Sequence, residues 1–351
     1  MTKPWLIVIG GFLGAGKTTL ILQAARVLCS RGLRVAAILN DQGGGLVDTG
    51  QVRRHGIPAG EVAGACFCCR FSDLLDRAAE LRKAEPDVIF AEPVGSCTDL
   101  SATILQPLKR DFRDQYRIAP FTVLVDPEQA ERFTTTESDT ELGFLFQQQI
   151  AEADIVAFTK IESGRNFAAL PVPEVRYLSG ITGQGVASWL NELFSGSITA
   201  GSKLLDIDYQ RYAEAEAALG WLNWTATLQL SNPLGAAELV GPFVDTLLSA
   251  LETEGARIAH LKVLDETPGS YLKVAATGNT EQPHVEGDLT ASPETLHEIR
   301  VNLRAVIEPG RLKQVFARQM EQLPGSRSGE VLECFSPGAP KPERRLGVVV
   351  T

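Results

Sequence analysis

The first half of the chain alternates apolar runs with amphipathic stretches. Continuous apolar runs predict strands that are covered on both faces, and they lie at residues 5–12, 34–40, 87–93, 119–127, 154–160 and 174–180. Apolar positions at helical spacing predict helices, which lie at residues 17–30, 71–84, 141–152 and 185–195. Strands alternating with helices predict an α/β domain with a doubly wound, mostly parallel sheet over residues 1–196.

The second half has a different pattern. Residues 221–230 place apolar side chains at every second position, which is typical of a strand with one exposed face. The same period of two recurs at residues 256–264, 270–277 and 299–307, and helical stretches occur at 236–254 and 310–322. These elements predict a smaller α+β domain at 221–322, for which a ferredoxin-like arrangement is the candidate. Residues 197–220 are expected to be a linker and residues 323–351 an irregular tail.

Composition and charge narrow the possible partners. The chain has 351 residues and a net charge of −10, whereas a nucleic-acid-binding protein normally presents a basic face. No apolar run approaches the roughly 20 residues that a membrane span requires. The N-terminal run 5–12 continues into a glycine loop, so we interpret it as a strand and expect a cytoplasmic protein. In the reducing cytosol, the six cysteines are expected to remain thiols.

A phosphate-binding motif follows the first predicted strand. In GGFLGAGKTT (10–19), Gly11, Gly16, Lys17 and Thr18 fit the P-loop pattern G-x-x-x-x-G-K-[ST]. The backbone amides of Gly14, Ala15 and Thr19 are predicted to join the glycines around the phosphates, because successive N–H groups in such a loop point inward. Lys17 is predicted to reach the β- and γ-phosphates, and the Thr18 hydroxyl to bind Mg²⁺. The alternative is a glycine-rich turn without this function.

Carboxylates end two further predicted strands. Glu92 closes the strand at 87–93, where a carboxylate holds Mg²⁺ directly or through water. Gly95 follows and is predicted to offer its amide to a γ-phosphate. Asp41 ends the strand at 34–40 and is a second candidate for the metal, and residues 42–48 are expected to move with nucleotide state. The alternatives are an acidic strand end and a flexible loop.

The base-binding motif is degenerate. A guanine-binding site of this type presents Asn-Lys-x-Asp, and FTKIE (158–162) has Lys160 in place, with Glu162 as the carboxylate and Thr159 where asparagine is usual. Ser179, after the next strand, is predicted to contact the base through its amide. Guanine is the preferred base, and a strand end with solvated charges is the alternative.

Three cysteines fall within four positions, and we call Cys66, Cys68 and Cys69 the cysteine cluster. Thiolates suit soft ions such as zinc, and the start of the next helix favours thiolates through its dipole. Two or three thiols form an open site, which suits an ion that is passed on. A redox switch and buried packing are the alternatives. Cys97 is interpreted as a small buried residue, with an extra ligand as the alternative.

Together these motifs resemble the CobW-type metal-handling GTPases, relatives of HypB and UreG. The resemblance covers the phosphate loop, the C-x-C-C motif, the segment from Glu92 to Gly95 and the base motif. It implies an N-terminal GTPase domain that couples GTP and Mg²⁺ to binding of zinc or cobalt, and delivery to a metal-dependent client. The sequence departs from the family pattern at Gly64–Ala65, at Asp41–Gln42, at Pro93, and at Thr159 and Glu162.

Two further functions remain open at the level of sequence. One is a P-loop kinase or ATPase that acts on a small molecule. The other is a nucleotide-dependent accessory switch for a cobalamin or corrinoid protein. The C-terminal sheet is expected to contact a client or a second copy in a homodimer.

Overall fold

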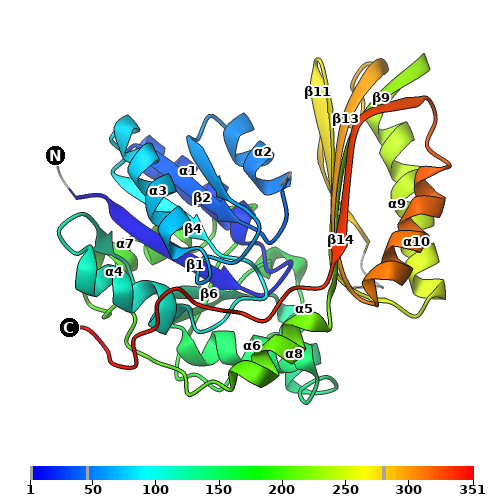
Figure 1. The fold of residues 1–351 in the computed structure, drawn as a ribbon. Coiled ribbons are helices and arrows are strands. Elements are labelled where there is room, and N and C mark those ends of the chain that lie inside the picture. The colour runs from blue at the N-terminus through cyan, green and yellow to red at the C-terminus, as the bar shows by residue number, and fades with distance from the viewer. Residues whose placement is uncertain (1–2, 45–46, 279–281) are drawn as a thin grey trace. The chain divides into compact units, whose positions relative to one another are not determined.

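The computed structural model describes residues 3–44, 47–278 and 282–351. Two compact units make up the chain (Figure 1). The first unit comprises Met1–Gln42, Asp48–Ala215 and Ala339–Thr351, and the second comprises Gly43–Val47 and Glu216–Gly338. Within the described residues, no helix is both long and apolar enough to span a membrane.

The first unit is built on a parallel sheet. Its elements are β1 (Trp5–Gly11), α1 (Lys17–Ser30), β2 (Val35–Asn40), α2 (Val47–Arg54), β3 (Ala59–Val62), α3 (Phe71–Leu81), β4 (Val88–Glu92), a π-helical turn (Ser101–Leu105), α4 (Gln106–Asp111), β5 (Arg117–Ile118), β6 (Thr122–Val125), α5 (Pro127–Thr134), α6 (Glu141–Glu152), β7 (Ile155–Phe158), β8 (Val175–Tyr177), α7 (Val186–Ser195) and α8 (Tyr209–Ala217). Short 3₁₀ turns at Arg82–Ala84 and Ile161–Ser163 complete the unit.

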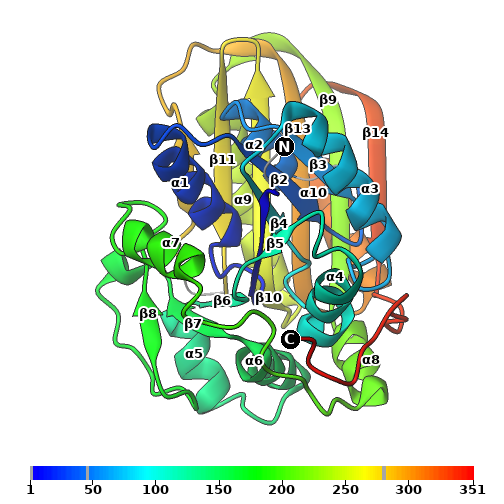
Figure 2. The same ribbon diagram turned by 90° about the vertical axis from the view of Figure 1, so that its left-hand side faces the viewer.

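The strand order places the carboxyl ends of the central strands beside one another. The order is β3-β2-β4-β1-β6-β7-β8, with β5 beside β1, and all these pairs are parallel. Helices cover both faces, with α1 and α7 on one side and α3 and α4 on the other (Figure 2). The chain winds in opposite directions from β1, and ligands of such sheets bind beyond the carboxyl ends at this point. The predicted doubly wound P-loop fold is therefore confirmed.

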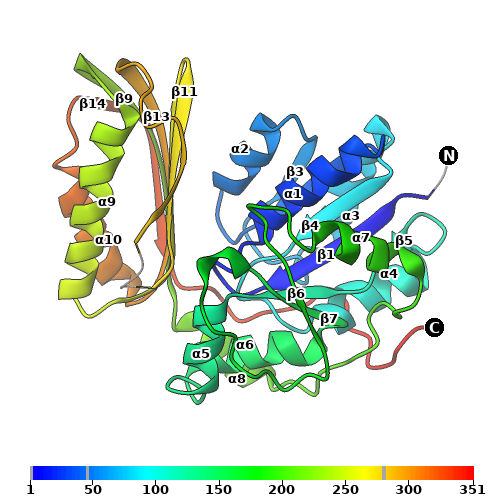
Figure 3. The same cartoon turned by 180° about the vertical axis from the view of Figure 1, so that it is seen from behind.

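The second unit is an antiparallel sheet with two helices on one face (Figure 3). Its elements are β9 (Gly220–Leu234), α9 (Ala236–Thr253), β10 (Arg257–Thr267), β11 (Ser270–Ala276), β12 (His284–Gly287), β13 (Glu294–Val306), α10 (Pro309–Met320) and β14 (Ser326–Phe335). The strand order is β12-β11-β10-β13-β9-β14. Without the β11–β12 hairpin, this is the βαββαβ order of a ferredoxin-like fold.

The alternating pattern of β9 explains the core of the second unit. Trp224 and Leu228 are buried on the face that the helices cover, and Trp224 packs edge-on against Phe316 of α10. Burial of one strand face against amphipathic helices is the arrangement that a period of two predicts. The segment Gly43–Val47 belongs to this unit, where the Val47 amide donates to Asn302 Oδ1 over 3.1 Å.

The structure contains α2, β3, α4, α5 and β12, which the sequence pattern did not predict, and it differs from the prediction in the expected linker and tail. Residues 209–217 of the expected linker form α8, and residues 326–335 of the expected tail form β14. Most residues of β14 are exposed, so the strand lacks the apolar run that would have predicted it. Its conformation comes from backbone pairing with β9, which connects distant parts of the chain. From Ala339 onward the chain has no regular structure and packs on the first unit.

Candidate functional site

The phosphate loop joins β1 to α1. Gly16 precedes α1 with φ 85°, a left-handed conformation that favours glycine, and Gly11 and Gly14 also have positive φ. The Lys17 ammonium donates to the carbonyl oxygens of Gly11 and Phe12 over 2.8 and 3.1 Å. The Lys17 side chain therefore folds back over its own loop, the position from which it would contact bound phosphates.

The strand end of β4 contacts this loop at two points. The Thr18 hydroxyl donates to Glu92, whose carboxylate oxygens lie 2.9 and 3.1 Å away. Gly95 approaches the loop so closely that an added Cβ would lie 3.0 Å from Leu13 N and Cα. Both Thr18 and Glu92 are buried. The pairing of a loop hydroxyl with a strand-end carboxylate is the donor set that Mg²⁺ uses in P-loop proteins.

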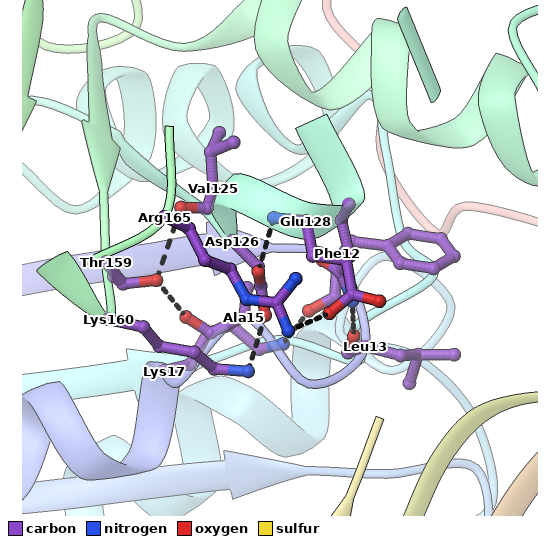
Figure 4. A network of polar contacts seen from close by, with 11 residues as sticks. Phe12, Leu13, Ala15, Lys17, Val125, Asp126, Glu128, Thr159, Lys160 and Arg165 are labelled. Carbon is purple, nitrogen blue, oxygen red and sulfur yellow. Dashed lines mark hydrogen bonds and ion pairs between the residues drawn. The ribbon is translucent and has the colours of Figure 1, made fainter. Parts of the chain in front are cut away.

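The base-side segment is tied to the phosphate loop (Figure 4). The Thr159 hydroxyl donates to the carbonyl oxygen of Ala15 over 2.8 Å. Lys160, which has φ 52°, makes an ion pair with Asp126 over 2.5 Å. Asp126 also caps α5 by accepting from the Glu128 amide. These contacts fix the carboxyl ends of β6 and β7 relative to the phosphate loop.

Two other predicted base contacts lie in different surroundings. Ser179 is fully buried, and its hydroxyl accepts from the Thr182 amide over 2.9 Å. The next residue, Gly180, packs on α1, since an added Cβ would lie 3.0 Å from Thr19 Cγ2. Glu162 lies in an exposed 3₁₀ turn. The Ser179 segment is thus beside the start of α1, and the roles of both residues stay predictions.

The cysteine cluster occupies a turn between β3 and α3. The Sγ atoms of Cys66 and Cys68 lie 2.8 Å apart, and Cys69 Sγ lies 3.4 and 3.8 Å from them. The turn is closed by the amides of Cys69 and Arg70, which both donate to Cys66 O over 3.0 Å. Among the residues that the structure describes, this is the one group of three or more cysteine, histidine or carboxylate donors within 4.8 Å.

Asn40 holds this turn in place, and the sequence analysis missed its role. At the end of β2, its amide nitrogen donates to the carbonyl oxygens of Val62 and Ala65 over 2.9 and 2.8 Å. Its amide oxygen accepts from the Phe67 backbone N–H over 2.7 Å. One buried side chain thus fixes three points around the cysteine cluster. The available signal was a polar residue at the carboxyl end of a buried strand.

The thiols of the cysteine cluster differ in acidity. The pKa of Cys66 lies well below its usual range because the thiols of Cys68, Cys69 and Cys97 form hydrogen bonds with it. The hydrogen bond with Cys66 raises the pKa of Cys69 to about 11. The Lys341 amide also donates to Cys69 Sγ, over 3.1 Å. One thiolate beside neighbouring thiols can bind a soft cation, and binding displaces the protons of the other thiols.

The sequence can now be compared with known families. The sequence model of the CobW/HypB/UreG nucleotide-binding domain matches residues 5–171. Residues 5–171 belong to the CobW/HypB/UreG family. This match confirms the predicted family and the assignment of the chain as a P-loop GTPase, because members of this family are GTPases. The remainder of the chain lies outside the match.

Solved structures similar to this chain include two metal-bound proteins. The zinc-bound YjiA GTPase from E. coli is 15% identical with a TM-score of 0.34, over 92% of this chain and 99% of that chain. HypB from Helicobacter pylori in complex with nickel is 16% identical with a TM-score of 0.41, over 55% of this chain and 86% of that chain. We base the family assignment on the sequence match alone.

The CobW/HypB/UreG domain brings its predicted site residues together in two groups. The phosphate loop lies at the end of β1, with Glu92 at the end of the neighbouring β4. The cysteine cluster lies beside β2, which pairs with the other edge of β4. Asp41 donates its amide to Val62 O over 3.2 Å, and its carboxylate does not join the cysteine cluster. Residues 45 and 46 of the predicted mobile stretch lie outside the described residues.

The C-terminal segment, Ala339–Thr351, runs along the CobW/HypB/UreG domain (Figure 1) and contacts the cysteine cluster through Lys341. The Glu343 amide donates to Cys68 O over 2.9 Å, and its carboxylate accepts from Ser72 Oγ over 2.7 Å. Further along, Arg345 pairs with the buried carboxylate of Asp99 over 2.8 Å. These contacts connect residues that are distant in sequence, so no local pattern predicted them.

A buried carboxylate supports the segment after Gly95. Glu152 is fully buried, accepting from the Thr98 hydroxyl over 3.1 Å and from the Ser101 amide over 2.9 Å. Burial away from water raises the pKa of Glu152 to about 8. The folded protein therefore retains a proton on this side chain at pH values where the unfolded chain, with a pKa of about 4.3, has lost it.

We expect Glu152→Gln to remove part of the pH dependence of stability. Glutamine reproduces the protonated acid, since its oxygen accepts from Ser101 while its NH₂ donates to Thr98. The wild-type protein should lose stability as pH rises from about 5 to 9, by on the order of 4 kcal/mol from this group. Urea unfolding at pH 5 and pH 9 measures the difference. The variant should match the wild type at pH 5 and exceed it at pH 9. Parallel pH curves for the two proteins would contradict the buried acid.

Proposed function

We propose that this GTPase binds a transition-metal ion, zinc or cobalt, at the cysteine cluster, and that the bound nucleotide controls its affinity for the metal. The observation that carries the proposal is the convergence of three thiols on one turn at the edge of the nucleotide-binding sheet. Thiolate sulfur is the ligand that zinc favours in proteins, and it is a poor ligand for magnesium. Zinc would therefore bind at the cysteine cluster and magnesium at the phosphate loop, because the two sites offer different ligand atoms.

Adjacent strands supply the route for coupling. β4 ends in Glu92, which bonds Thr18 of the phosphate loop. β2 pairs with β4 and ends in Asn40, which bonds the cysteine turn at three points. If a bound phosphate shifts the loop after β4, the shift would reach the residues around the cysteine cluster through the packed strands β4 and β2. Coupling is reciprocal, so the metal should also change the affinity for nucleotide by the same factor.

The test measures zinc and cobalt affinity of the full chain with GDP and with a non-hydrolysable GTP analogue. A competing chelator reports the dissociation constant. We expect the two nucleotide states to differ by about tenfold or more, the size of common allosteric couplings. The variant with Cys66→Ala, Cys68→Ala and Cys69→Ala should lose tight binding in both states. Cys29→Ala, at an exposed cysteine outside the cluster, is the matched control and should bind as the wild type does.

Each outcome separates one part of the proposal from the others. Equal metal affinity in the two nucleotide states would reject coupling and leave the metal site intact. Tight binding by the triple variant would remove the cysteines from the site. Reversible disulfide formation without metal uptake would favour the redox switch, and a phosphorylated small-molecule product would favour the kinase. Experiments on delivery to a client and on a homodimer come after metal binding has been tested.

The Lys341 amide gives a second prediction for the metal site. Lys341→Pro removes the N–H that donates to Cys69 Sγ together with the lysine side chain, and it should keep the backbone extended because the neighbouring residues Pro340 and Pro342 already favour that conformation. We expect zinc affinity to fall about tenfold, as when an outer partner of a metal ligand is lost. Lys341→Ala keeps the N–H and should retain the wild-type affinity. Equal affinities for both variants would show that this hydrogen bond does not support the site.

A further inference from the structure

The C-terminal segment is bound to the cysteine turn and to the start of α3. The Lys341 amide donates to Cys69 Sγ over 3.1 Å, and the Glu343 amide donates to Cys68 O over 2.9 Å. The Glu343 carboxylate accepts from both the amide and the hydroxyl of Ser72, over 3.0 and 2.7 Å. Since α3 has no side-chain cap of its own, this carboxylate binds one of the amides that have no partner within the helix.

A charged contact holds the middle of the C-terminal segment. Arg345 pairs over 2.8 Å with the carboxylate of Asp99, which is 1% exposed and also accepts from the Tyr209 hydroxyl over 2.6 Å. An unpaired buried carboxylate is costly, so this ion pair favours the bound position of the C-terminal segment. Asp99 lies on the segment after β4, whose Gly95 packs on the phosphate loop.

The contacts of the C-terminal segment are polar and separate from one another. Arg344 pairs with Asp111 over 2.7 Å, and the Val350 amide donates to Gln106 of α4 over 2.7 Å (Figure 2). Pro340 is the only buried residue of this fully described segment. A segment that buries little apolar surface opens at a lower free energy than the strands and helices of the core.

We propose that the C-terminal segment closes the cysteine cluster, so that the metal ion enters and leaves when this segment moves away. This inference rests on the proposed metal-binding function and adds its regulation. Cys66 and Cys68 are 4% and 1% exposed, so an ion reaches their sulfur atoms only if the surrounding chain moves. Asn40 holds the cysteine turn at three points. The C-terminal segment is therefore the neighbour of the cysteine cluster that opens at the lowest cost.

Closing by this segment acts on rates rather than on affinity. While the segment is closed most of the time, a change in how often it opens alters metal entry and metal release by the same factor. The dissociation constant is the ratio of the two rate constants, so it stays the same. A client that displaces the C-terminal segment would therefore accelerate release of the metal without weakening its ligands.

Glu343→Ala tests this role in the full chain, because it removes the carboxylate that binds Ser72 and keeps every backbone N–H of the segment. We expect zinc entry, and zinc release to an excess of a chromophoric chelator, both to become about tenfold faster, which corresponds to about 1.4 kcal/mol. The dissociation constant should change little. Stopped-flow absorbance measures both rates. Glu80→Ala, which removes an exposed carboxylate paired with Arg77 on α3, is the matched control and should leave both rates unchanged.

Hydrogen exchange gives a second measurement that requires no metal. The amides of Lys341, Glu343 and Leu346 all donate to acceptors in the protein, so a peptide covering residues 339–351 should exchange more slowly in the folded chain than as a free peptide. In Glu343→Ala this exchange should become about tenfold faster, because the segment opens more often. Exchange in β4 should not change.

The outcomes distinguish this inference from the proposed function. Exchange of residues 339–351 in the wild type at the rate of the free peptide would overturn the closing role. Unchanged zinc rates in Glu343→Ala, or a loss of zinc affinity with an unchanged entry rate, would also overturn it. These results leave metal binding in place. Absence of zinc binding by the wild type would overturn the proposed function, and the inference with it.

Discussion

Lys17→Ala is expected to weaken binding of both GTP and GDP by about 100- to 1000-fold. The ammonium donates to two carbonyl oxygens of its own loop, Gly11 and Phe12. Bound phosphates would replace these neutral acceptors by charged ones. Hydrogen bonds to charged groups contribute about 1.5–3 kcal/mol each, so losing two of them costs about 3–6 kcal/mol, and the expected loss of affinity lies in the lower part of that range. Titration with fluorescent GDP and GTP analogues measures the effect.

Two controls separate loss of the ammonium from loss of the fold. Lys17→Met keeps most of the side-chain stem and should lose as much affinity as Lys17→Ala. Lys83→Ala removes a lysine from the 3₁₀ turn that follows α3 and should bind nucleotide normally. Thermal unfolding without nucleotide should be similar for all variants. Nucleotide affinity within a few-fold of the wild type in Lys17→Ala would reject the phosphate-loop assignment.

Four strands of the parallel sheet were predictable because they are apolar up to their carboxyl ends. The runs that became β1, β2, β4 and β7 have no polar residue before their carboxyl ends, and this pattern does not depend on distant contacts. The phosphate loop was predictable for a related reason, since its function depends on consecutive residues. The polar strand β14 was not, because pairing with β9 determines its structure.

The surroundings of the cysteine cluster were also only partly predictable. The spacing of the cysteine cluster was visible in the sequence, but Asn40 is separated from the cysteines it positions by a strand crossover. Cys97 was interpreted as a small buried residue, and it is buried. Sequence spacing reports residues that share a turn, whereas residues from two segments meet only through the strand order of the sheet.

The sheet also explains why the segment after β4 is central to the proposed coupling. Glu92 contacts the phosphate loop, and Gly95 packs on that loop. Both residues lie at the end of β4, where the chain turns at residues 95 and 96. A displacement of the phosphate loop would therefore reach this segment by direct contact.

Glu92→Gln is expected to lower the rate of GTP hydrolysis by about 100-fold, the size of effect that loss of one well-placed electrostatic group produces. Both carboxylate oxygens of Glu92 accept from the Thr18 hydroxyl, so the acid orients the group predicted to bind Mg²⁺. Glutamine has one acceptor oxygen and no charge, and it should raise the Mg²⁺ concentration needed for half-maximal activity. Single-turnover hydrolysis measured against Mg²⁺ concentration tests both effects.

The dependence on Mg²⁺ separates this role from a structural one. In EDTA, where no Mg²⁺ is bound, GDP affinity should be the same for Glu92→Gln and for the wild type, because the carboxylate acts through the ion. With Mg²⁺ present the two proteins should diverge, as the charge of Glu92 stabilises the cation beside the phosphates. A variant that loses nucleotide affinity equally with and without Mg²⁺ would show instead that Glu92 only supports the fold of the phosphate loop.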